Sequence, residues 1–452
     1  MNNKGSLIVE IIVSSAICGV TLLSLSLLVF QSQYILASET LKSQALKIAD
    51  NRLASSTDMS TSSVEGVFHT NTIIDSIDNF TKKITINVSY PYLKRVLSVS
   101  LSTFVTDTSE SQGQSSCRPV QDIELWKKLI TYSFDLGLEG KKLQPTDIDV
   151  VGHYAYITSN TASSSDADLI ILDISDIKNL VILSYLNTGP GLLSLHVAGN
   201  YAYVGNSSVN SQFQIIDVTD KAHPHIVSSY KLLGNYNDAT TVGNVVFYKS
   251  GKIYLGTQKS AIAELHVIDV SLPSSPHELS SYEIGSAIND IFVFKDRVYV
   301  ATPDNEELKI FSFISNNLFN ISSYDAPGSL SNGKRLTLFL NKIYLGMTVG
   351  KDELYALDTS STPPLPIFHS LMGSSIHGII AYGKLLFVLS SNQSNGFVVF
   401  DVSSSSTLPY RVNTFPVSFS GNPLNFDCDQ GIFAVVSEDS SVILFITYSQ
   451  II

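Results

Sequence analysis

Seven similar units follow one another in the last two thirds of the chain, and this repetition constrains the fold more than any other feature. The second apolar segment of each unit carries an aromatic residue, and successive aromatics are 43 to 51 residues apart. They are Tyr156, Tyr203, Tyr254, Tyr299, Tyr344, Phe387 and Phe433. Each unit has room for four short β-strands with their turns, the size of one propeller blade. The sequence therefore predicts an all-β, seven-bladed propeller.

The two ends of the repeat region indicate how this ring closes. The last unit stops after its third strand and lacks an outer one. Before the first unit lies an unassigned segment, residues 129–136, which matches the outer-strand pattern of residues 180–186. Pairing this segment with the last blade would remove two free sheet edges at once. We therefore expect a propeller over residues 129–452, closed by strand 129–136.

The third strand of most units is an apolar quartet followed by Asp and a β-branched residue, as in residues 169–174 and 265–270. These units resemble the LVIVD repeats of bacterial and archaeal surface β-propellers. Two units depart from the pattern, with Ser312 and Thr447 at the Asp position. The resemblance implies a fold and no particular chemistry. We interpret the recurrent Asp as a turn residue whose carboxylate accepts backbone N–H groups.

The beginning of the chain is apolar. Residues 7–30 carry a single charge, Glu10, and as a helix this stretch would be long enough to cross a bilayer core. A carboxylate in lipid is costly unless it finds a partner, so its presence indicates a function. Lys4 precedes the stretch and the next basic residue is Lys42, which favours an N-terminus on the inner side.

Lys4 and Gly5 followed by Ser6 to Glu10 resemble the N-terminus of type IV prepilins and type II secretion pseudopilins. The resemblance implies cleavage by a prepilin peptidase between Gly5 and Ser6, methylation of the new N-terminus, and subunit assembly through Glu10. Ser6 replaces the usual phenylalanine, and the proline kink of major pilins is missing, so a minor or pilin-like protein is expected. The alternative is an ordinary signal anchor with an isolated glutamate.

The region between this motif and the propeller is expected to complete a pilin-like unit. Residues 1–5 would be the leader and 6–55 one long helix, transmembrane first and amphipathic later. Three strand-like runs, 67–74, 82–90 and 94–105, predict a small antiparallel sheet within residues 56–106. Residues 107–128 lack periodicity and suggest a flexible linker. An anchor followed by a coiled-coil stalk is the alternative.

Composition excludes several functions. The chain of 452 residues is too long for one core, and 40 acidic against 28 basic residues argue against nucleic-acid binding. Cys18, Cys117 and Cys428 are scattered, and we expect neither a disulfide framework nor a metal site from them. No nucleophile elbow, phosphate loop or metalloprotease motif occurs. The sequence predicts a non-enzymatic protein without a cofactor.

Two sets of polar residues are candidates for binding. Alignment on the second-strand aromatic brings five residues of the innermost strands to similar depths in the channel: Asp147, Asp149, His196, Asp290 and Arg335. They define a candidate channel-lining ligand site, although solvated strand ends would look the same. The loops between second and third strands carry further acids that could form an acidic rim or be merely soluble hairpin tips: Asp166, Asp168, Asp304, Glu306, Glu307, Asp352, Glu353, Glu438 and Asp439.

Together these features predict a pilin-like, membrane-inserted surface protein that displays a propeller as a binding or adhesion head on a pilus-like or pseudopilus filament. Its expected partners are prepilin peptidase, other pilin subunits, lipid through residues 7–30, and an extracellular ligand. The alternative is a non-filament, membrane-anchored propeller outside the cytoplasm that acts as a receptor or scaffold. An enzyme is the third class, supported by fold analogy alone.

Overall fold

The computed structural model divides into two compact units, residues 1–107 and 108–452. It describes residues 41–49, 62–65, 67–76, 81–92, 95–106, 117, 126, 129–137, 143–161, 166–233, 241–304, 306–328, 332–339, 341–348, 352–392, 396–402, 409–416 and 421–447.

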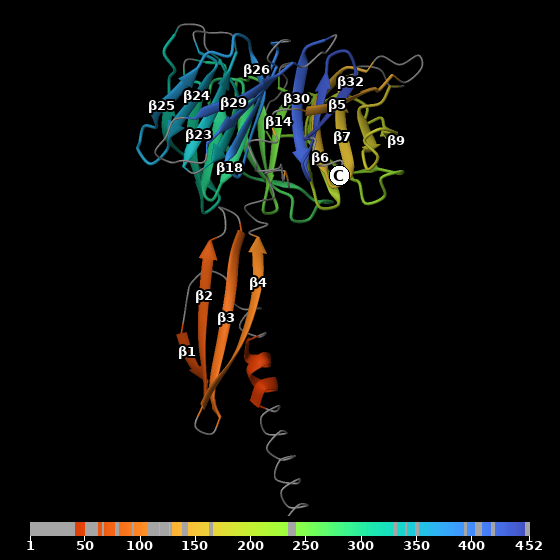
Figure 1. Ribbon diagram of the computed structural model, residues 1–452. Coiled ribbons are helices and arrows are strands. Elements are labelled where there is room, and N and C mark those ends of the chain that lie inside the picture. The colour runs from red at the N-terminus through yellow and green to blue at the C-terminus, as the bar shows by residue number, and fades with distance from the viewer. Residues whose placement is uncertain are drawn as a thin grey trace, which may run out of the picture. The chain divides into compact units, whose positions relative to one another are not determined.

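The second unit contains seven four-stranded antiparallel sheets, the blades of a propeller (Figure 1). The innermost strands are β6 (Pro145–Val151), β10 (Leu192–Ala198), β14 (Gly243–Lys249), β18 (Asp290–Phe294), β22 (Gly333–Phe339), β26 (Ile376–Tyr382) and β30 (Pro423–Asp429). The second strands are β7 (Tyr154–Ser159), β11 (Tyr201–Ser208), β15 (Lys252–Thr257), β19 (Arg297–Ala301), β23 (Lys342–Met347), β27 (Leu385–Ser390) and β31 (Ile432–Ser437).

The outer half of each blade has the same regularity. The third strands are β8 (Leu169–Asp173), β12 (Ser211–Asp217), β16 (Leu265–Asp269), β20 (Leu308–Ile314), β24 (Leu354–Asp358), β28 (Phe397–Asp401) and β32 (Ser441–Thr447). The outermost strands are β9 (Val181–Leu186), β13 (His225–Tyr230), β17 (His277–Tyr282), β21 (Asn317–Tyr324), β25 (Leu365–Ser370), β29 (Tyr410–Phe415) and β5 (Leu129–Asp135).

The ring closes through β5. This strand precedes every blade in the chain, yet it pairs antiparallel with β32, from Leu129 opposite Thr447 to Asp135 opposite Ser441. In Figure 1 the early strand β5 lies beside the late, blue β32. The innermost strands also contact one another in a closed cycle, in which β30 of the last blade touches β6 of the first. The pairing covers the outer edge of β32, which would otherwise be free, and makes β5 the outermost strand of the last blade.

The core lies between adjacent blades. Strands two and three are buried on both faces because each blade packs against a neighbour on either side, so their residues are apolar without alternation. The quartet Leu169–Leu172 of β8 is fully buried, as are Ala155 and Ile157 of β7. The outermost strands instead consist mainly of half-buried and exposed residues, as in β9. This gradient explains the apolar quartets of the repeat.

Two residues upstream of β5 belong to the packing of the propeller. Cys117 forms a disulfide with Cys428 of β30, with Cα atoms 4.9 Å apart. Trp126 is 1% exposed, and its ring lies 4.8 Å from that of Phe387 and 5.7 Å from that of Phe433. The expectation that the cysteines form no disulfide is wrong, because the fold brings together two residues 311 positions apart. Within the segment expected to be a flexible linker, these two residues are fixed in the core.

The first unit is a four-stranded antiparallel sheet in the order β1 (Ser62–Glu65), β2 (Phe68–Ser76), β3 (Thr81–Tyr92) and β4 (Arg95–Thr106). A helical segment over residues 41–49 supplies Ala45 and Ala49 to a small core. Ile86, Val88 and Tyr90 of β3 form the sheet side of that core. These alternating residues are what the period of two in the sequence predicts.

The predicted fold class is wrong in its first element. A long helix over residues 6–55 is not found: the described helical residues are 41–49, and the described chain is otherwise nearly all β. In the same part of the chain, no helix is long and apolar enough to span a bilayer. Residues 6–40 and 50–55 lie outside the described residues. An apolar periodicity reports a buried face, and in the described helical segment Ala45 and Ala49 pack that face on the sheet.

Candidate ligand site in the central channel

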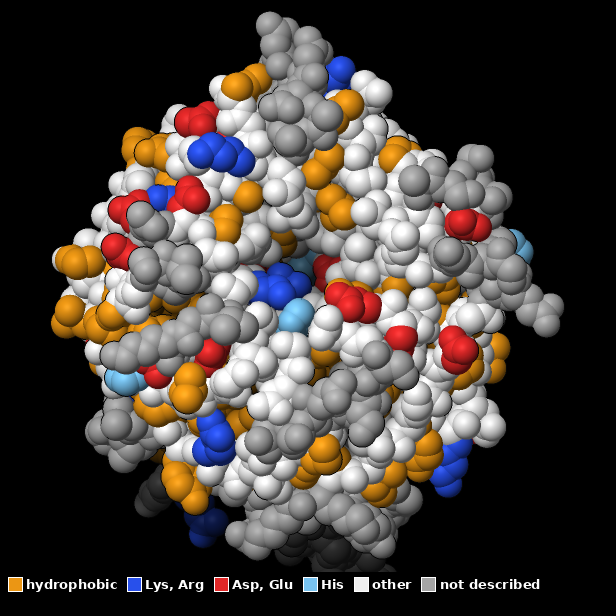
Figure 2. All heavy atoms as spheres, turned by 90° about the horizontal axis from the view of Figure 1, so that it is seen from above, with side chains coloured by type: hydrophobic (Ala, Val, Ile, Leu, Met, Phe, Trp, Pro, Cys, Tyr) orange, Lys and Arg blue, Asp and Glu red, His pale blue; other side chains and the backbone are white. Residues whose placement is uncertain are grey.

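The innermost strands enclose a cavity of about 350 Å³ at the centre of the ring. Figure 2 shows basic, acidic and histidine side chains gathered around this central opening. All five residues expected in the channel line the cavity: Asp147, Asp149, His196, Asp290 and Arg335. The structure thus brings together residues from β6, β10, β18 and β22, and whether they bind a ligand stays a prediction.

The channel aspartates join neighbouring blades. The Asp147 carboxylate accepts the backbone N–H of Leu195 on β10 at 3.0 Å, and Asp149 accepts that of Val197 at 2.6 Å. Asp290 of β18 likewise accepts the N–H of Leu336 on β22 at 2.8 Å. Each innermost strand has one edge that no strand of its own blade pairs. These carboxylates satisfy N–H groups on that edge of the next blade, which makes them structural.

Two residues of this kind were missed from the sequence. Asp427 of β30 accepts the N–H of Val150 at 2.8 Å, and Asp429 accepts that of Gly152 at 2.5 Å. Asp427 lies opposite Ala434 in its hairpin, as Asp149 lies opposite Tyr156. In the last blade the aromatic Phe433 stands one place earlier in the second strand than in the other blades. Alignment on Ala434 would have revealed Asp427 as the equivalent of Asp149.

Amide and hydroxyl groups make related connections elsewhere in the ring. The Asn244 side chain donates to the Ile288 carbonyl at 2.6 Å, and that of Asn289 to the Gly333 carbonyl at 2.7 Å. Asn425 Nδ2 donates to Asp147 at 2.6 Å, which links the last blade to the first. The polar lining of the channel is thus in large part the set of connections between blades.

Burial changes the proton affinity of the channel acids. Desolvation raises the pKa of Asp147 and raises that of Asp290 to about 6, although the charge of Arg335 opposes both shifts. The pKa of Asp427 is raised well above its usual value, first by burial and then by Asp149, to which its side chain is hydrogen-bonded. Burial and the charge of Asp149 thus favour the protonated form of Asp427.

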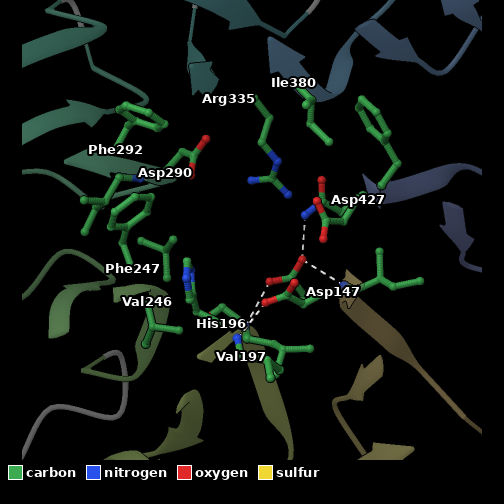
Figure 3. Close-up of a pocket in the computed structure, with 18 of the residues that line it drawn as sticks. Asp147, His196, Val197, Val246, Phe247, Asp290, Phe292, Arg335, Ile380 and Asp427 are labelled. Carbon is green, nitrogen blue, oxygen red and sulfur yellow. Dashed lines mark hydrogen bonds between the residues drawn. The ribbon is translucent and has the colours of Figure 1, made fainter. Parts of the chain in front are cut away.

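The cationic side of the channel lies on β22 and β26. Arg335 Nε donates to the His377 carbonyl at 2.8 Å, and Lys334 Nζ lies 3.2 Å from His377 Nδ1. Burial and the neighbouring Arg335 lower the pKa of Lys334 to about 8, and burial with Lys334 lowers that of His377 to about 3. Figure 3 shows the Arg335 guanidinium pointing into the cavity between Asp290 and Asp427.

An apolar wall faces these charges. Phe247 and Phe292 lie 5.5 Å apart between ring centroids, and His196 packs its ring 5.3 Å from Phe247. Val246 and Ile380 add aliphatic surface in the same close-up (Figure 3). The site therefore combines a guanidinium, hydrogen-bonded carboxyl groups and aromatic surface, a composition typical of small-molecule pockets.

The Asp that follows the apolar quartet is a turn residue in four of the third strands, as the sequence predicts. Asp173 accepts the N–H of Ser175 at 2.8 Å, and Asp217 accepts that of Thr219 at 2.8 Å. Asp269 and Asp358 make the same contact to Ser271 and Ser360. Hydrogen bonds from the side-chain hydroxyl, and then from the backbone N–H, of the same Ser or Thr lower the pKa of Asp173 and its counterparts.

Three acids of the candidate acidic rim are buried and therefore do not belong to an exposed rim. Asp168, Glu307 and Glu353 are at most 1% exposed. Each holds a later loop of its own blade by accepting backbone N–H groups, for example Glu353 from Met372 at 2.7 Å. Within the described residues, no group of three or more His, Cys, Asp or Glu side chains is arranged to hold a metal. The processing and assembly residues Gly5, Ser6 and Glu10 lie outside the described residues.

Comparisons with known proteins agree with this fold. The LVIVD repeat model matches residues 144–188, 193–232 and 261–284. A structure of virginiamycin B lyase from Staphylococcus aureus is similar at a TM-score of 0.53 and 13% identity, over 71% of this chain and 99% of that one. A chain of the mitotic checkpoint complex is similar at 0.54 and 12% identity, over 71% and 91%.

At these identities the likeness concerns the fold alone. A search of curated proteins finds no matching relative. The second unit of this chain is therefore a β-propeller that carries LVIVD repeats.

Proposed function

We propose that this protein is a surface-displayed binding protein whose propeller is the binding or adhesion head. The observation that carries the proposal is the cavity at the axis of the closed propeller, which is lined by both polar and apolar side chains. The propeller is also a compact unit of its own. A binding role without catalysis is part of the proposal, since the channel acids are engaged in joining blades.

The buried disulfide between Cys117 and Cys428 supports a location outside the cytoplasm. Disulfides persist in oxidising compartments and are rare where thiols are kept reduced. Such a location agrees with the expected orientation of the chain, in which everything after the apolar stretch 7–30 is exported.

The finer part of the proposal concerns display on a filament. We infer from the prepilin-like motif that prepilin peptidase cleaves between Gly5 and Ser6, and that Glu10 joins the product to other pilin-like subunits. Residues 7–30 would contact lipid before assembly. The helical segment packed on the sheet β1–β4 supports this idea, because an amphipathic helix on an antiparallel sheet suits a pilin-like base.

Mass spectrometry of the mature protein tests the processing step. The expected N-terminus is Ser6 with an added methyl group, whereas an intact Met1 would contradict the prepilin-like part and favour the anchored receptor or scaffold. The assembly step is tested with Glu10→Ala, which should reduce recovery in sheared filaments without reducing the amount in the cell. Glu39→Ala, a glutamate outside the motif, is the matched control and should leave recovery unchanged.

A further inference from the structure

Arg335 is the one Lys or Arg side chain among the described residues that line the cavity, and some of its N–H donors have no acceptor there. A guanidinium has five N–H donors. Nε donates to the His377 carbonyl at 2.8 Å, and Nη1 lies 3.3 Å from the Asn289 carbonyl and 3.4 Å from that of Lys334. All these acceptors are backbone carbonyls, and no ion pair joins Arg335 to a carboxylate among the described residues. The charges of Asp147 and Asp290 still interact with the guanidinium at longer range. The two N–H groups of Nη2 have no acceptor among the described residues.

The aspartates around the cavity differ from Arg335, because each already accepts at least one backbone N–H group of a neighbouring strand. Asp147 accepts from Asn425, Ile148 and Leu195. Asp290 accepts from Ile291 at 2.9 Å and Leu336 at 2.8 Å. The Nη2 group of Arg335 is therefore a donor on a permanent cation that no described residue satisfies. Its complement is an anionic acceptor.

The residues next to Arg335 strengthen the preference for an anion. Lys334 lies beside it in sequence, with its ammonium group 3.2 Å from His377 Nδ1. No ion pair joins Lys334 to a described carboxylate either. Burial and then the charge of Arg335 lower the pKa of Lys334 to about 8, although the charge of Glu438 opposes that shift. An anion bound at Arg335 would supply the missing negative charge to both side chains.

We propose that the central cavity binds a small organic anion, with its carboxylate on the Nη2 N–H groups of Arg335 and its hydrocarbon part against Phe247 and Phe292. The cavity of about 350 Å³ lies at the small end of the range for small-molecule pockets and has room for such an anion. This inference rests on the proposed binding function of the propeller and specifies the chemistry of its ligand. Val246 extends the apolar surface on the side of Phe247, and Ile380 adds aliphatic surface beside Arg335 (Figure 3).

Calorimetric titration of the full chain with hexanoate, and with the uncharged hexanamide, tests the proposal. Hexanoate should bind with one-to-one stoichiometry and hexanamide at least about tenfold more weakly, because it lacks the charge that Arg335 recognises. Arg335→Gln should weaken hexanoate about tenfold or more and leave the weak hexanamide binding unchanged. Arg411→Gln is the matched control, since Arg411 lies on the outermost strand β29 and bonds to Ser370 and Leu371.

A pH series adds a second readout. Asp290, with a pKa of about 6, loses its negative charge as pH falls from 7.5 to 5.5, so hexanoate should bind more tightly at the lower pH. The other charged or titratable groups around the site are Asp147, Asp149, Asp427, His196, His377, Lys334 and Glu438. Of these, Asp147 and Asp427 shift affinity in the same direction, because burial also raises their pKa values.

Three results would overturn the proposal: no hexanoate binding at millimolar concentration, equal binding of hexanamide, or equal binding by Arg335→Gln. If that variant fails to fold, arginine-selective ¹⁵N NMR of the unmodified protein decides, because hexanoate must shift the Arg335 side-chain resonance and hexanamide must not. These results are separable from the test of filament display, which reads the N-terminus and does not depend on the cavity.

Discussion

A carboxylate oxygen of Asp427 accepts the backbone N–H of Val150 at 2.8 Å, although the two residues are 277 positions apart in the chain. Asp427 belongs to the last blade and Val150 to the first. The contact crosses the seam at which the ring closes, on the channel side, whereas the β5–β32 pairing closes it at the outside. Two contacts therefore close the ring: the hydrogen bond between Asp427 and Val150 at the channel, and the pairing of β5 with β32 at the outer side.

Asp427→Asn should stabilise the protein at neutral pH. Burial and Asp149 raise the folded-state pKa of Asp427, so the folded protein binds this proton more tightly than the unfolded chain does. The stability that this proton provides is present at acid pH and is lost as pH rises through the unfolded and then the folded pKa. Asparagine keeps an oxygen acceptor for Val150 and removes the ionisation.

Thermal unfolding from pH 4 to pH 8 measures this effect. The variant should show a higher Tm than the parent at pH 8, a difference that shrinks toward pH 4. Asp173→Asn is the control, because Asp173 lies in an outer turn where hydrogen bonds lower its pKa. A variant less stable than the parent at pH 8 would show that the carboxylate form is favoured at the seam.

Removal of the disulfide should destabilise the propeller. Cys117 and Cys428 are both fully buried, and their bond ties the segment before β5 to β30 of the last blade. A disulfide that closes a long loop stabilises by roughly 2–5 kcal/mol, chiefly by restricting the unfolded chain. Cys117→Ser should therefore lower the denaturant midpoint, and a reducing agent should do the same to the parent.

Cys18→Ser provides the comparison for the disulfide test. It should leave the denaturant midpoint unchanged, and mass spectrometry after alkylation should find Cys117 and Cys428 protected in the unreduced protein. Free thiols at both positions would contradict the pairing.

Trp126→Ala should cost about 3–5 kcal/mol of unfolding free energy, the usual range for a buried Trp. The ring is 1% exposed between Phe387 and Phe433, and its loss would leave a cavity at the junction of two blades. The chain has a single Trp, so the parent's intrinsic fluorescence reports this junction directly. Its emission should shift to the red on unfolding, together with the loss of β-sheet signal in circular dichroism.

Tyr410→Ala is the control for this substitution, since Tyr410 is 70% exposed on an outermost strand. Its denaturant midpoint should match that of the parent. If Trp126→Ala also matched the parent, Trp126 would contribute nothing to the core.

Glu353→Ala should destabilise by about 2–3 kcal/mol. Its carboxylate accepts the N–H groups of Met372 at 2.7 Å and Gly373 at 3.1 Å, and truncation leaves both without that acceptor in a buried place. Glu353→Gln keeps one acceptor oxygen and should recover part of the loss. Asp304→Ala, at an exposed loop position, should change stability by less than about 0.5 kcal/mol in the same urea titration.

Much of the propeller could be predicted from the sequence because each blade repeats the same local pattern. The spacing of the aromatic residues indicated the number of blades. The outer-strand pattern of residues 129–136 indicated that this segment would pair with the third strand of the last blade. The recurrent Asp was correctly interpreted as a turn residue, because its hydrogen bond to the residue two places on is local. Sheet β1–β4 has one strand more than expected, since the short β1 lacks an alternating pattern.

The candidate site was only partly predictable. Asp147, Asp149, His196, Asp290 and Arg335 were found by a shared depth in the repeat, and they line one cavity. Asp427 was missed because the aromatic of the last blade is displaced by one position. The sequence also could not show that Glu307 and Glu353 are buried supports of loops, since an acid near a hairpin tip is ordinarily solvated.

The sequence by itself determined the repeat, the strand periodicities and the local turns, because these depend on neighbours within a few residues. Only the tertiary structure decided which distant groups meet. It paired Cys117 with Cys428 and placed Asp427 on Val150. It also left the Nη2 group of Arg335 without a described acceptor, because the acceptors within reach of a side chain depend on all the strands around it.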